Sequence, residues 1–286
     1  MLIHKKKRVL VLKPRCPEHV TATIPTAKAF QYKGATLVAV PHKLDEVRVL
    51  RNMGIKAPSP ILHYYDWSRN VHTVPKPFFA QTETAAFLTV HPRSFVLSGL
   101  GSGKTLSSLW SYDYLRSIGE RRRLLVVSTL STLDRAWGDT IFEHFPHLTF
   151  SVLHGSKEKR LKLLNQLVDI YIINHDGLKV IGDAFSDRPD IDMVIVDEVS
   201  EAARNSQTDR WKSLNEVVNK QPARMKFPPR YCIGLTATPV PNDPTDAWAQ
   251  CRLITPDTVP PYFNRFKDMV MRQSGPYNWV PREGAM

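Results

Sequence analysis

Apolar and polar residues follow one another in blocks that predict a sheet covered by helices. Short, almost continuously apolar runs recur from residue 94 to residue 235, and each is followed by a stretch with apolar residues at helical spacing. These runs are residues 94–97, 123–128, 149–153, 169–174, 192–197 and 231–235. Strands that are apolar throughout are buried on both faces, which is typical of a parallel sheet between helices. The pattern predicts a doubly wound α/β domain.

The first part of the chain has a different pattern, which predicts a smaller α/β unit. Residues 8–12 and 35–40 are rich in β-branched residues, and residues 44–54 have helical spacing with a final glycine. Prolines then interrupt regular structure before the main lobe begins. The predicted divisions are a small α/β module (1–65), a proline-rich linker or arm (66–80) and the α/β lobe (81–286).

A glycine-rich turn, SGLGSGKT, follows the first apolar run of the lobe. A strand, such a turn and a helix in succession point backbone N–H groups and the positive helix end into one concavity, which suits phosphate oxygens. The turn matches the Walker A pattern except that Ser98 replaces the first glycine, and in that pattern Lys104 contacts the β- and γ-phosphates while Thr105 binds Mg²⁺. The predicted nucleotide-binding residues are Gly99, Gly101, Ser102, Gly103, Lys104 and Thr105.

Two adjacent acids, Asp197 and Glu198, end the apolar run at 192–197. The carboxyl ends of strands are where ligands bind in open parallel sheets. We therefore predict that Asp197 holds Mg²⁺ together with Thr105, and that Glu198 polarises a water molecule for attack on the γ-phosphate. Lys104, Asp197 and Glu198 are the predicted catalytic residues.

A further apolar run continues as LTATP, which places the hydroxyls of Thr236 and Thr238 at the same sheet edge. With Asp197-Glu198, this segment resembles motifs II and III of superfamily 2 helicases, particularly the Swi/Snf-type branch, in which the phosphate loop typically begins with a residue other than glycine. The resemblance implies a first RecA-like lobe that uses ATP and Mg²⁺ to move on DNA, with Thr236 and Thr238 coupling hydrolysis to movement. Within that branch, the chain resembles the compact phage-encoded Swi/Snf-like helicases.

The same resemblance assigns roles to other segments. It implies that Gln81 reads the adenine edge and that Phe78 or Phe79 stacks on the base; an apolar entry to a helix is the alternative for the phenylalanines. The segments LLVVSTLSTLDRAW and YIINHDGL are similar to segments that grip a nucleic-acid backbone. The implied nucleic-acid contacts are Thr129, Ser131, Thr132, Asn174 and His175, and Asn205 and Arg210 match the family's usual residues after motif II.

The chain departs from the family pattern at two places. Thr129 stands where proline is common, and Val199-Ser200 replaces the usual Ala-His, a change that bears on coupling. Near the N-terminus, the chain is similar to the small substrate-recognition module of annealing helicases, which implies DNA contacts at Lys28, Tyr32 and Lys33. A folded decoration with solvated lysines is the alternative.

Composition and charge agree with a DNA partner. The net charge of +12 favours a polyanionic partner. Three distant cysteines predict neither a disulfide framework nor a zinc site, and no apolar segment is long enough to span a bilayer. We expect a cytoplasmic protein with no membrane partner, in the host cytoplasm if it is phage-encoded.

Other conspicuous side chains have simpler interpretations. His144 and His147 lack a third ligand nearby in sequence, so no metal is expected there. Trp137 and Trp248 lie on apolar helix faces and are expected in the core. The residues 121–123, all arginine, are expected at the solvated end of a loop.

The sequence after Pro241 has no counterpart of the second RecA-like lobe that supplies arginine fingers in these helicases. We therefore expect half of a motor, weakly active alone, with the second lobe in the rest of a longer polypeptide or, alternatively, on another chain. Two other functions are open: a nucleic-acid-binding module that uses ATP only as a conformational ligand, and a P-loop small-molecule kinase.

Overall fold

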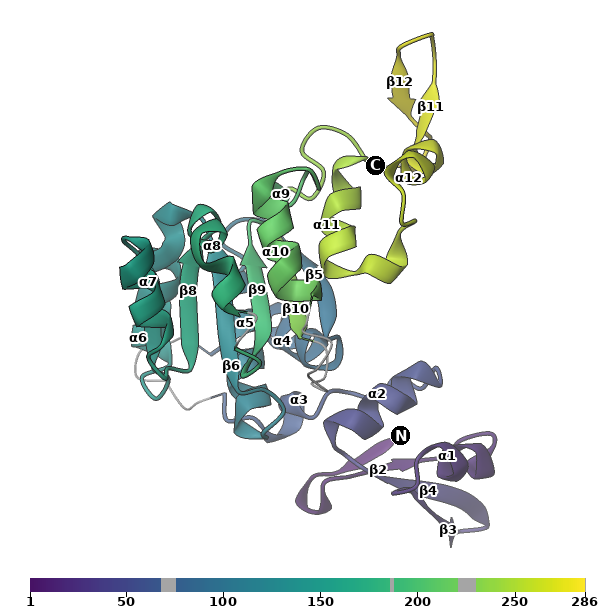
Figure 1. Ribbon diagram of the computed structural model, residues 1–286. Coiled ribbons are helices and arrows are strands. Elements are labelled where there is room, and N and C mark those ends of the chain that lie inside the picture. Colours follow the sequence, from purple (N-terminus) through teal and green to yellow (C-terminus); the bar gives the residue numbers. More distant parts are fainter. Residues whose placement is uncertain (68–75, 186–187, 221–229, 286) are drawn as a thin grey trace.

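The computed structural model describes residues 1–67, 76–185, 188–220 and 230–285. Its main sheet has six strands in the order β5-β10-β9-β6-β8-β7, and every neighbouring pair is parallel. The strands are β5 (Arg93–Leu97), β6 (Arg123–Ser128), β7 (Phe150–Val152), β8 (Ile170–Asn174), β9 (Ile191–Asp197) and β10 (Tyr231–Thr236). Each predicted apolar run forms one of these strands, and the predicted doubly wound α/β fold is confirmed (Figure 1).

Helices cover both faces of this sheet. Successive residues of a strand point to opposite sides, so each face presents apolar side chains to its own layer of helices. Leu124 and Val126 of β6 join one core with helices α4, α5 and α6, whereas Leu125 and Val127 join a second core with α7, α8, α10 and α11. The helices are α4 (Phe79–Val90), α5 (Lys104–Ser117), α6 (Asp139–His144), α7 (Lys157–Leu164), α8 (His175–Ile181), α9 (Val199–Ala202), α10 (Asp209–Asn219) and α11 (Asp246–Ile254).

The N-terminal module is built on a four-stranded antiparallel sheet in the order β1-β2-β4-β3. Its helix α2 buries Leu44, Val47 and Leu50, as their spacing predicts. The short strands β1 and β3 and the helix α1 were not expected from the sequence. The elements are β1 (Leu2–His4), β2 (Val9–Leu12), α1 (Pro17–Thr23), β3 (Lys28–Tyr32), β4 (Ala35–Pro41), α2 (Leu44–Asn52) and α3 (Ile61–Tyr64).

Side chains of α2 and α4 join this module to the lobe. Arg48 of α2 donates a hydrogen bond to the Thr89 carbonyl at 3.1 Å and another to the Tyr231 hydroxyl at the start of β10. On the lobe side, the Arg121 guanidinium lies 3.9 Å from the centre of the Tyr231 ring. Because buried residues of both parts belong to one core cluster, the module packs against the lobe. The domain boundaries themselves stay a prediction, and residues 68–75 of the expected linker lie outside the described residues.

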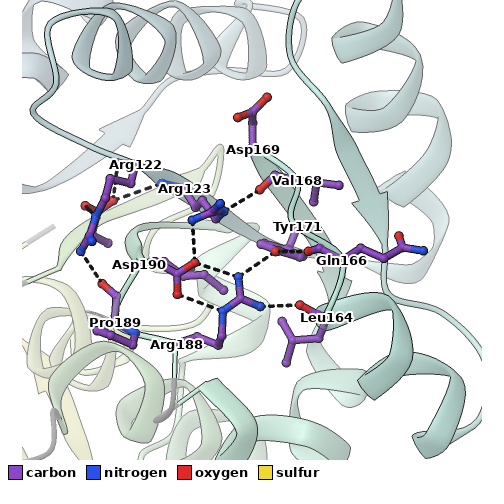
Figure 2. Close-up of polar contacts among 12 residues, drawn as sticks. Arg122, Arg123, Leu164, Gln166, Val168, Asp169, Tyr171, Arg188, Pro189 and Asp190 are labelled. Atoms are coloured by element: carbon purple, nitrogen blue, oxygen red, sulfur yellow. Dashed lines mark hydrogen bonds and ion pairs between the residues drawn. The ribbon is translucent and has the colours of Figure 1, made fainter.

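The expectation of a solvated loop at residues 121–123 is wrong for two of its three arginines. Arg121 is only 8% exposed, since it stacks on Tyr231. Arg123 pairs with Asp190 at 2.8 Å, and Asp190 in turn pairs with Arg188 at 2.8 Å (Figure 2). These charges lie where β6 and β9 begin, so they tie the amino-terminal edge of the sheet together.

A C-terminal arm follows α11 and extends away from the lobe (Figure 1). It consists of α12 (Phe263–Val270) and a hairpin of β11 (Met271–Gln273) and β12 (Trp279–Pro281). Trp248, expected in the core, is instead half-buried beside this arm, where its indole donates to the Pro260 carbonyl at 2.9 Å and contacts Phe263. Within the described residues, none of the helices has the length and apolar character needed to cross a membrane.

Candidate active site

The glycine-rich turn connects β5 to α5 and opens at the carboxyl edge of the main sheet. Gly101 and Gly103 have φ angles of +71° and +80°, a conformation that L side chains rarely adopt. A Cβ atom on Gly103 would lie 2.1 Å from Nε2 of Gln81, so the two residues are in direct contact. The structure therefore brings Gln81 of α4 against the loop, although they are far apart in sequence.

Lys104 and Thr105 occupy the first turn of α5. The Lys104 ammonium donates to the Ser98 carbonyl at 2.8 Å and to the Gly99 carbonyl at 3.0 Å, so it folds back over the loop. The amino end of this 14-residue helix carries unpaired N–H groups and a partial positive charge. The loop is thus a concave, positively charged cradle, which fits phosphate groups.

The carboxylate of Asp197 lies at the end of β9 and is almost fully buried, at 9% exposure. Its Oδ2 accepts hydrogen bonds from the Ser128 hydroxyl at 2.8 Å and from the Trp137 indole at 2.9 Å. Its Oδ1 accepts the Glu198 backbone N–H at 3.1 Å. These donors fix the orientation of the carboxylate at the edge of the sheet. Sequence reasoning placed Trp137 in the core, which is correct, but it missed the contact with Asp197.

Glu198 adopts a left-handed backbone conformation with φ of +46°, which is rare for a residue with a side chain. Burial raises the pKa of its carboxyl above the ordinary value, and the negative charge of Asp197 raises it further, while Lys104 lowers it. Because β5 and β9 both pair in parallel with β10, the loop and the acidic pair lie at the same edge of the sheet. A strained backbone and a perturbed pKa are features of functional sites.

Hydroxyl groups link the acidic segment to the next strand. The Ser200 hydroxyl, on α9, lies 2.9 Å from the Thr236 hydroxyl at the end of β10. The Thr236 hydroxyl also accepts the backbone N–H of Thr238 at 3.1 Å. Ser200, where the chain departs from the family pattern, therefore forms a direct polar connection between the two predicted motifs.

The predicted nucleic-acid contacts fall into two groups. Thr129, Ser131 and Thr132 form a loop after β6, in which Ser131 is exposed and the two threonines are half-buried. Asn174, the last residue of β8, and His175, the first residue of α8, are buried. Asn174 accepts from Arg160 at 3.2 Å, while the His175 ring lies 3.0 Å from the Asp197 carbonyl and its pKa is lowered by burial. Asn174 and His175 are thus buried residues that pack beneath the candidate site.

The segment after motif II is anchored to the first turn of α8. Arg210 donates through Nε and Nη2 to the two carboxylate oxygens of Asp176, at 2.9 and 2.7 Å. This pairing lowers the pKa of Asp176 to about 2. Asn205 accepts the backbone N–H of Gln207 at 2.9 Å and so shapes the turn before α10.

The two candidate adenine-stacking rings, those of Phe78 and Phe79, are exposed and do not pack in the core. Phe78 and Phe79 are 73% and 80% exposed, and the Gln81 side chain accepts the Phe78 backbone N–H at 2.9 Å. Large exposed aromatic side chains at a site of this kind are suited to contact a ligand or another protein surface.

The residues present fit a nucleotide with its metal. Mg²⁺ prefers oxygen ligands and is usually bound by one or two carboxylates together with substrate phosphates. Thr105 offers a hydroxyl and Asp197 a carboxylate at the edge onto which the cradle opens. All strands of the sheet run in the same direction, so the ends of β5, β6, β9 and β10 meet at this edge.

A family model described as the SNF2-related domain matches residues 94–275, well over half of the chain. The chain belongs to the SNF2-related domain family. The resemblance to Swi/Snf-type proteins that the motifs indicate is thereby confirmed. Among curated proteins, the comparison gives no match.

Solved structures share the fold of this SNF2-related domain. The Sulfolobus solfataricus SWI2/SNF2 ATPase core in complex with dsDNA is 21% identical with a TM-score of 0.55, and the match covers 71% of this chain and 41% of that one. The Sulfolobus solfataricus SWI2/SNF2 ATPase core domain is 22% identical with a TM-score of 0.51, and 66% and 36% are covered. The chain thus spans about two fifths of the length of these cores.

Proposed function

We propose that this chain is the ATP-binding motor lobe of a DNA-dependent ATPase that moves on or remodels DNA. The observation that carries the proposal is the convergence of the phosphate cradle, with Lys104, and the acidic pair Asp197-Glu198 at one edge of a parallel sheet. Membership of the SNF2-related domain family supports it.

The chemistry follows from the positions of these side chains. The helix end and Lys104 would bind the β- and γ-phosphates and neutralise their charge. Thr105 and Asp197 would hold Mg²⁺, which supplies further neutralisation of the phosphate oxygens. Glu198 would accept a proton from, and orient, the attacking water. Its raised pKa makes it a stronger base than an ordinary glutamate when it is ionised.

A second RecA-like lobe would complete the site. In phosphoryl-transfer enzymes, an arginine finger from a second element contributes about 10³ to 10⁵ in turnover. We therefore propose that the chain alone binds ATP·Mg²⁺ but hydrolyses it feebly. The exposed rings of Phe78 and Phe79 beside the loop are available to the nucleotide.

DNA is the proposed polymer partner, with contacts along the loop at 129–132. The N-terminal sheet offers a second surface. Because side chains alternate along β3, Lys28, Phe30 and Tyr32 lie on one face, and Tyr32 is 55% exposed. Glu18 is the only acidic residue among the first 41, so this module is strongly basic. Aromatic and basic side chains on an open sheet suit stacking on bases and contacts with phosphates.

Substitution of Lys104 tests the proposal. Lys104→Ala should weaken binding of a fluorescent ATP analogue in Mg²⁺ by at least about 10-fold, because one charged contact to phosphate is worth about 1.5–3 kcal/mol. Lys162→Ala, on α7 away from this edge, is the matched control and should bind as the unaltered chain does. Equal affinity of the Lys104→Ala variant would refute the proposed site. Transfer of phosphate to a small-molecule acceptor would favour a kinase instead.

A further inference from the structure

Three hydroxyl side chains form a hydrogen-bonded series from the loop after β6 to the carboxylate of Asp197. Thr129 Oγ1 is 2.9 Å from Thr132 Oγ1, Thr132 Oγ1 is 2.7 Å from Ser128 Oγ, and Ser128 Oγ is 2.8 Å from Asp197 Oδ2. The inner end of this hydroxyl chain is completely buried at Ser128. At the outer end, Thr129 is half-buried, and its neighbour Leu130 is 59% exposed.

The number of protons fixes the direction of the inner part of this hydroxyl chain. An ionised carboxylate only accepts hydrogen bonds, and each hydroxyl has a single hydrogen to donate. Ser128 must therefore give its hydrogen to Asp197 and accept one from Thr132. The Thr132 hydroxyl also lies 3.1 Å from the Thr129 carbonyl oxygen, a second acceptor for its hydrogen, and Thr129 Oγ1 lies within reach of Ser131 Oγ at 3.2 Å as well as of Thr132. Hydrogen bonds aligned in this way polarise and strengthen one another.

The same short segment also supplies the second donor to that carboxylate oxygen. Trp137 lies in the π-helical turn Leu133–Gly138, which directly follows the loop, and its indole donates to Asp197 Oδ2. π-Helical turns occur frequently at functional sites. Both side-chain donors to Oδ2 are thus carried by residues 128–137, so a shift of this segment reorients the carboxylate.

We infer that the hydroxyls of Thr129, Thr132 and Ser128 couple the occupation of the loop by DNA to the orientation of the Asp197 carboxylate. These three are positioning residues that act through Asp197. The inference rests on the proposed function, because it requires a nucleotide and metal at Asp197 and DNA at the loop. Coupling between two sites is reciprocal, so bound nucleotide must change the affinity for DNA by the same factor as DNA changes that for nucleotide.

The test measures this factor with a matched pair of variants. Thr132→Val keeps the shape of the side chain but removes the hydroxyl, whereas Thr132→Ser keeps the hydroxyl and removes the methyl. The affinity of the full chain for a fluorescent 25-base-pair duplex is measured with Mg²⁺, with and without a hydrolysis-resistant ATP analogue. Loss of a direct DNA contact would lower both affinities equally, so their ratio isolates the coupling.

We expect the analogue to change the duplex affinity of the unaltered chain and of Thr132→Ser by at least about fivefold, in the range typical of coupled sites. The factor should fall below about twofold in Thr132→Val. Ser128→Ala and Thr129→Val should behave like Thr132→Val, and they test the chain independently if Thr132→Val fails to fold. Ser117→Ala, which removes a hydroxyl that donates to the Tyr114 carbonyl within α5, should keep the full factor.

Three results would overturn the inference. The first is a coupling factor in folded Thr132→Val that equals that of the unaltered chain. The second is a coupling factor that falls as far in Thr132→Ser as in Thr132→Val. The third is the absence of coupling in the unaltered chain. If the unaltered chain binds neither the analogue nor the duplex, the proposed function itself fails, and this outcome is visible before any variant is compared.

Discussion

At the scale of single residues, the candidate site depends on backbone conformations that few side chains permit. Gly103 has a left-handed conformation and contacts Gln81, and Glu198 adopts a similar conformation despite its side chain. Glycine adopts this conformation freely, whereas for Glu198 it is strained, and such strain persists only where the surrounding structure holds it in place. These two residues lie in the segments to which the proposal assigns nucleotide binding and water activation.

Glu198→Gln should separate nucleotide binding from hydrolysis. Removing a general base costs about 10²- to 10⁴-fold in rate, whereas the amide keeps the size of the side chain and ATP affinity should change by less than about threefold. The measurements are single-turnover hydrolysis and binding of a fluorescent analogue. Unchanged hydrolysis by the variant would exclude Glu198 as the base.

The pH dependence of hydrolysis by the unaltered chain follows from the same residue. The base must be ionised, so the rate should rise with pH as Glu198 loses its proton. Because burial and Asp197 raise the pKa of Glu198 above 4.5, the midpoint of the rise should lie above that value. A rate that is constant down to pH 4.5 would contradict this assignment.

Gly103→Ala should impair the loop. A left-handed conformation costs an alanine about 1–2 kcal/mol, and the new methyl would displace Gln81. We expect at least about 10-fold weaker binding of ATP, measured by titration. Gly182→Ala is the control, since a methyl group there meets open space.

At the scale of elements, the amino-terminal edge of the main sheet, opposite the candidate active site, is stabilised by a network of ion pairs. Asp190 lies between Arg123 and Arg188, and Arg188 also donates to the Tyr171 hydroxyl at 2.8 Å (Figure 2). Burial alone would raise the pKa of Asp190, but the two arginines outweigh burial and the net shift is downward. This network ties the start of β9 to the start of β6, where the strand pairing shifts register between Arg123 and Leu124.

Asp190→Ala should therefore lower the free energy of unfolding by about 1–3 kcal/mol at pH 7, because it leaves two partly buried arginines without their partner. The folded-state pKa of Asp190 is depressed, so its stabilisation is present above the ordinary pKa of 3.8 and is lost as pH falls below it. Urea unfolding at pH 7 and pH 3 measures both effects. Equal stability of the variant and the unaltered chain at pH 7 would show that the network is dispensable.

The sequence patterns predicted the strands of the main sheet, but they did not predict these side-chain contacts. All the apolar runs became strands, because burial on both faces leaves an unmistakable pattern in sequence. The burial of Arg121 depends on Tyr231, over a hundred residues later, and the contact of Trp137 with Asp197 spans sixty residues. Pairings of this kind depend on tertiary structure, and no local pattern encodes them. The C-terminal hairpin was likewise not foreseen.

At the scale of the whole molecule, the lobe and the N-terminal module provide different surfaces to one polyanion. The net charge is +12, and the basic module is anchored to the lobe through Arg48. Association with DNA should therefore release counterions from its phosphates and weaken as salt increases. The loop at 129–132 and the β3 face are the two proposed contact surfaces.

Duplex affinity should fall by at least about 100-fold between 50 and 200 mM salt, as several phosphate contacts require. The double variant Lys28→Ala, Lys33→Ala should reduce the slope of log affinity against log salt by about two, since each lost contact removes about 0.9. Its affinity for the ATP analogue should be unchanged. An unaltered slope would leave the N-terminal sheet without a role in DNA binding.

The central claim is that the glycine-rich loop and the acidic pair form one ATP·Mg²⁺ site. A crystal structure of the chain with a hydrolysis-resistant ATP analogue and Mg²⁺ tests it most directly. We predict the β- and γ-phosphates at the amino end of α5, in contact with Lys104, and the metal between Thr105 and Asp197. Nucleotide bound elsewhere, or a metal that contacts neither residue, would contradict the claim.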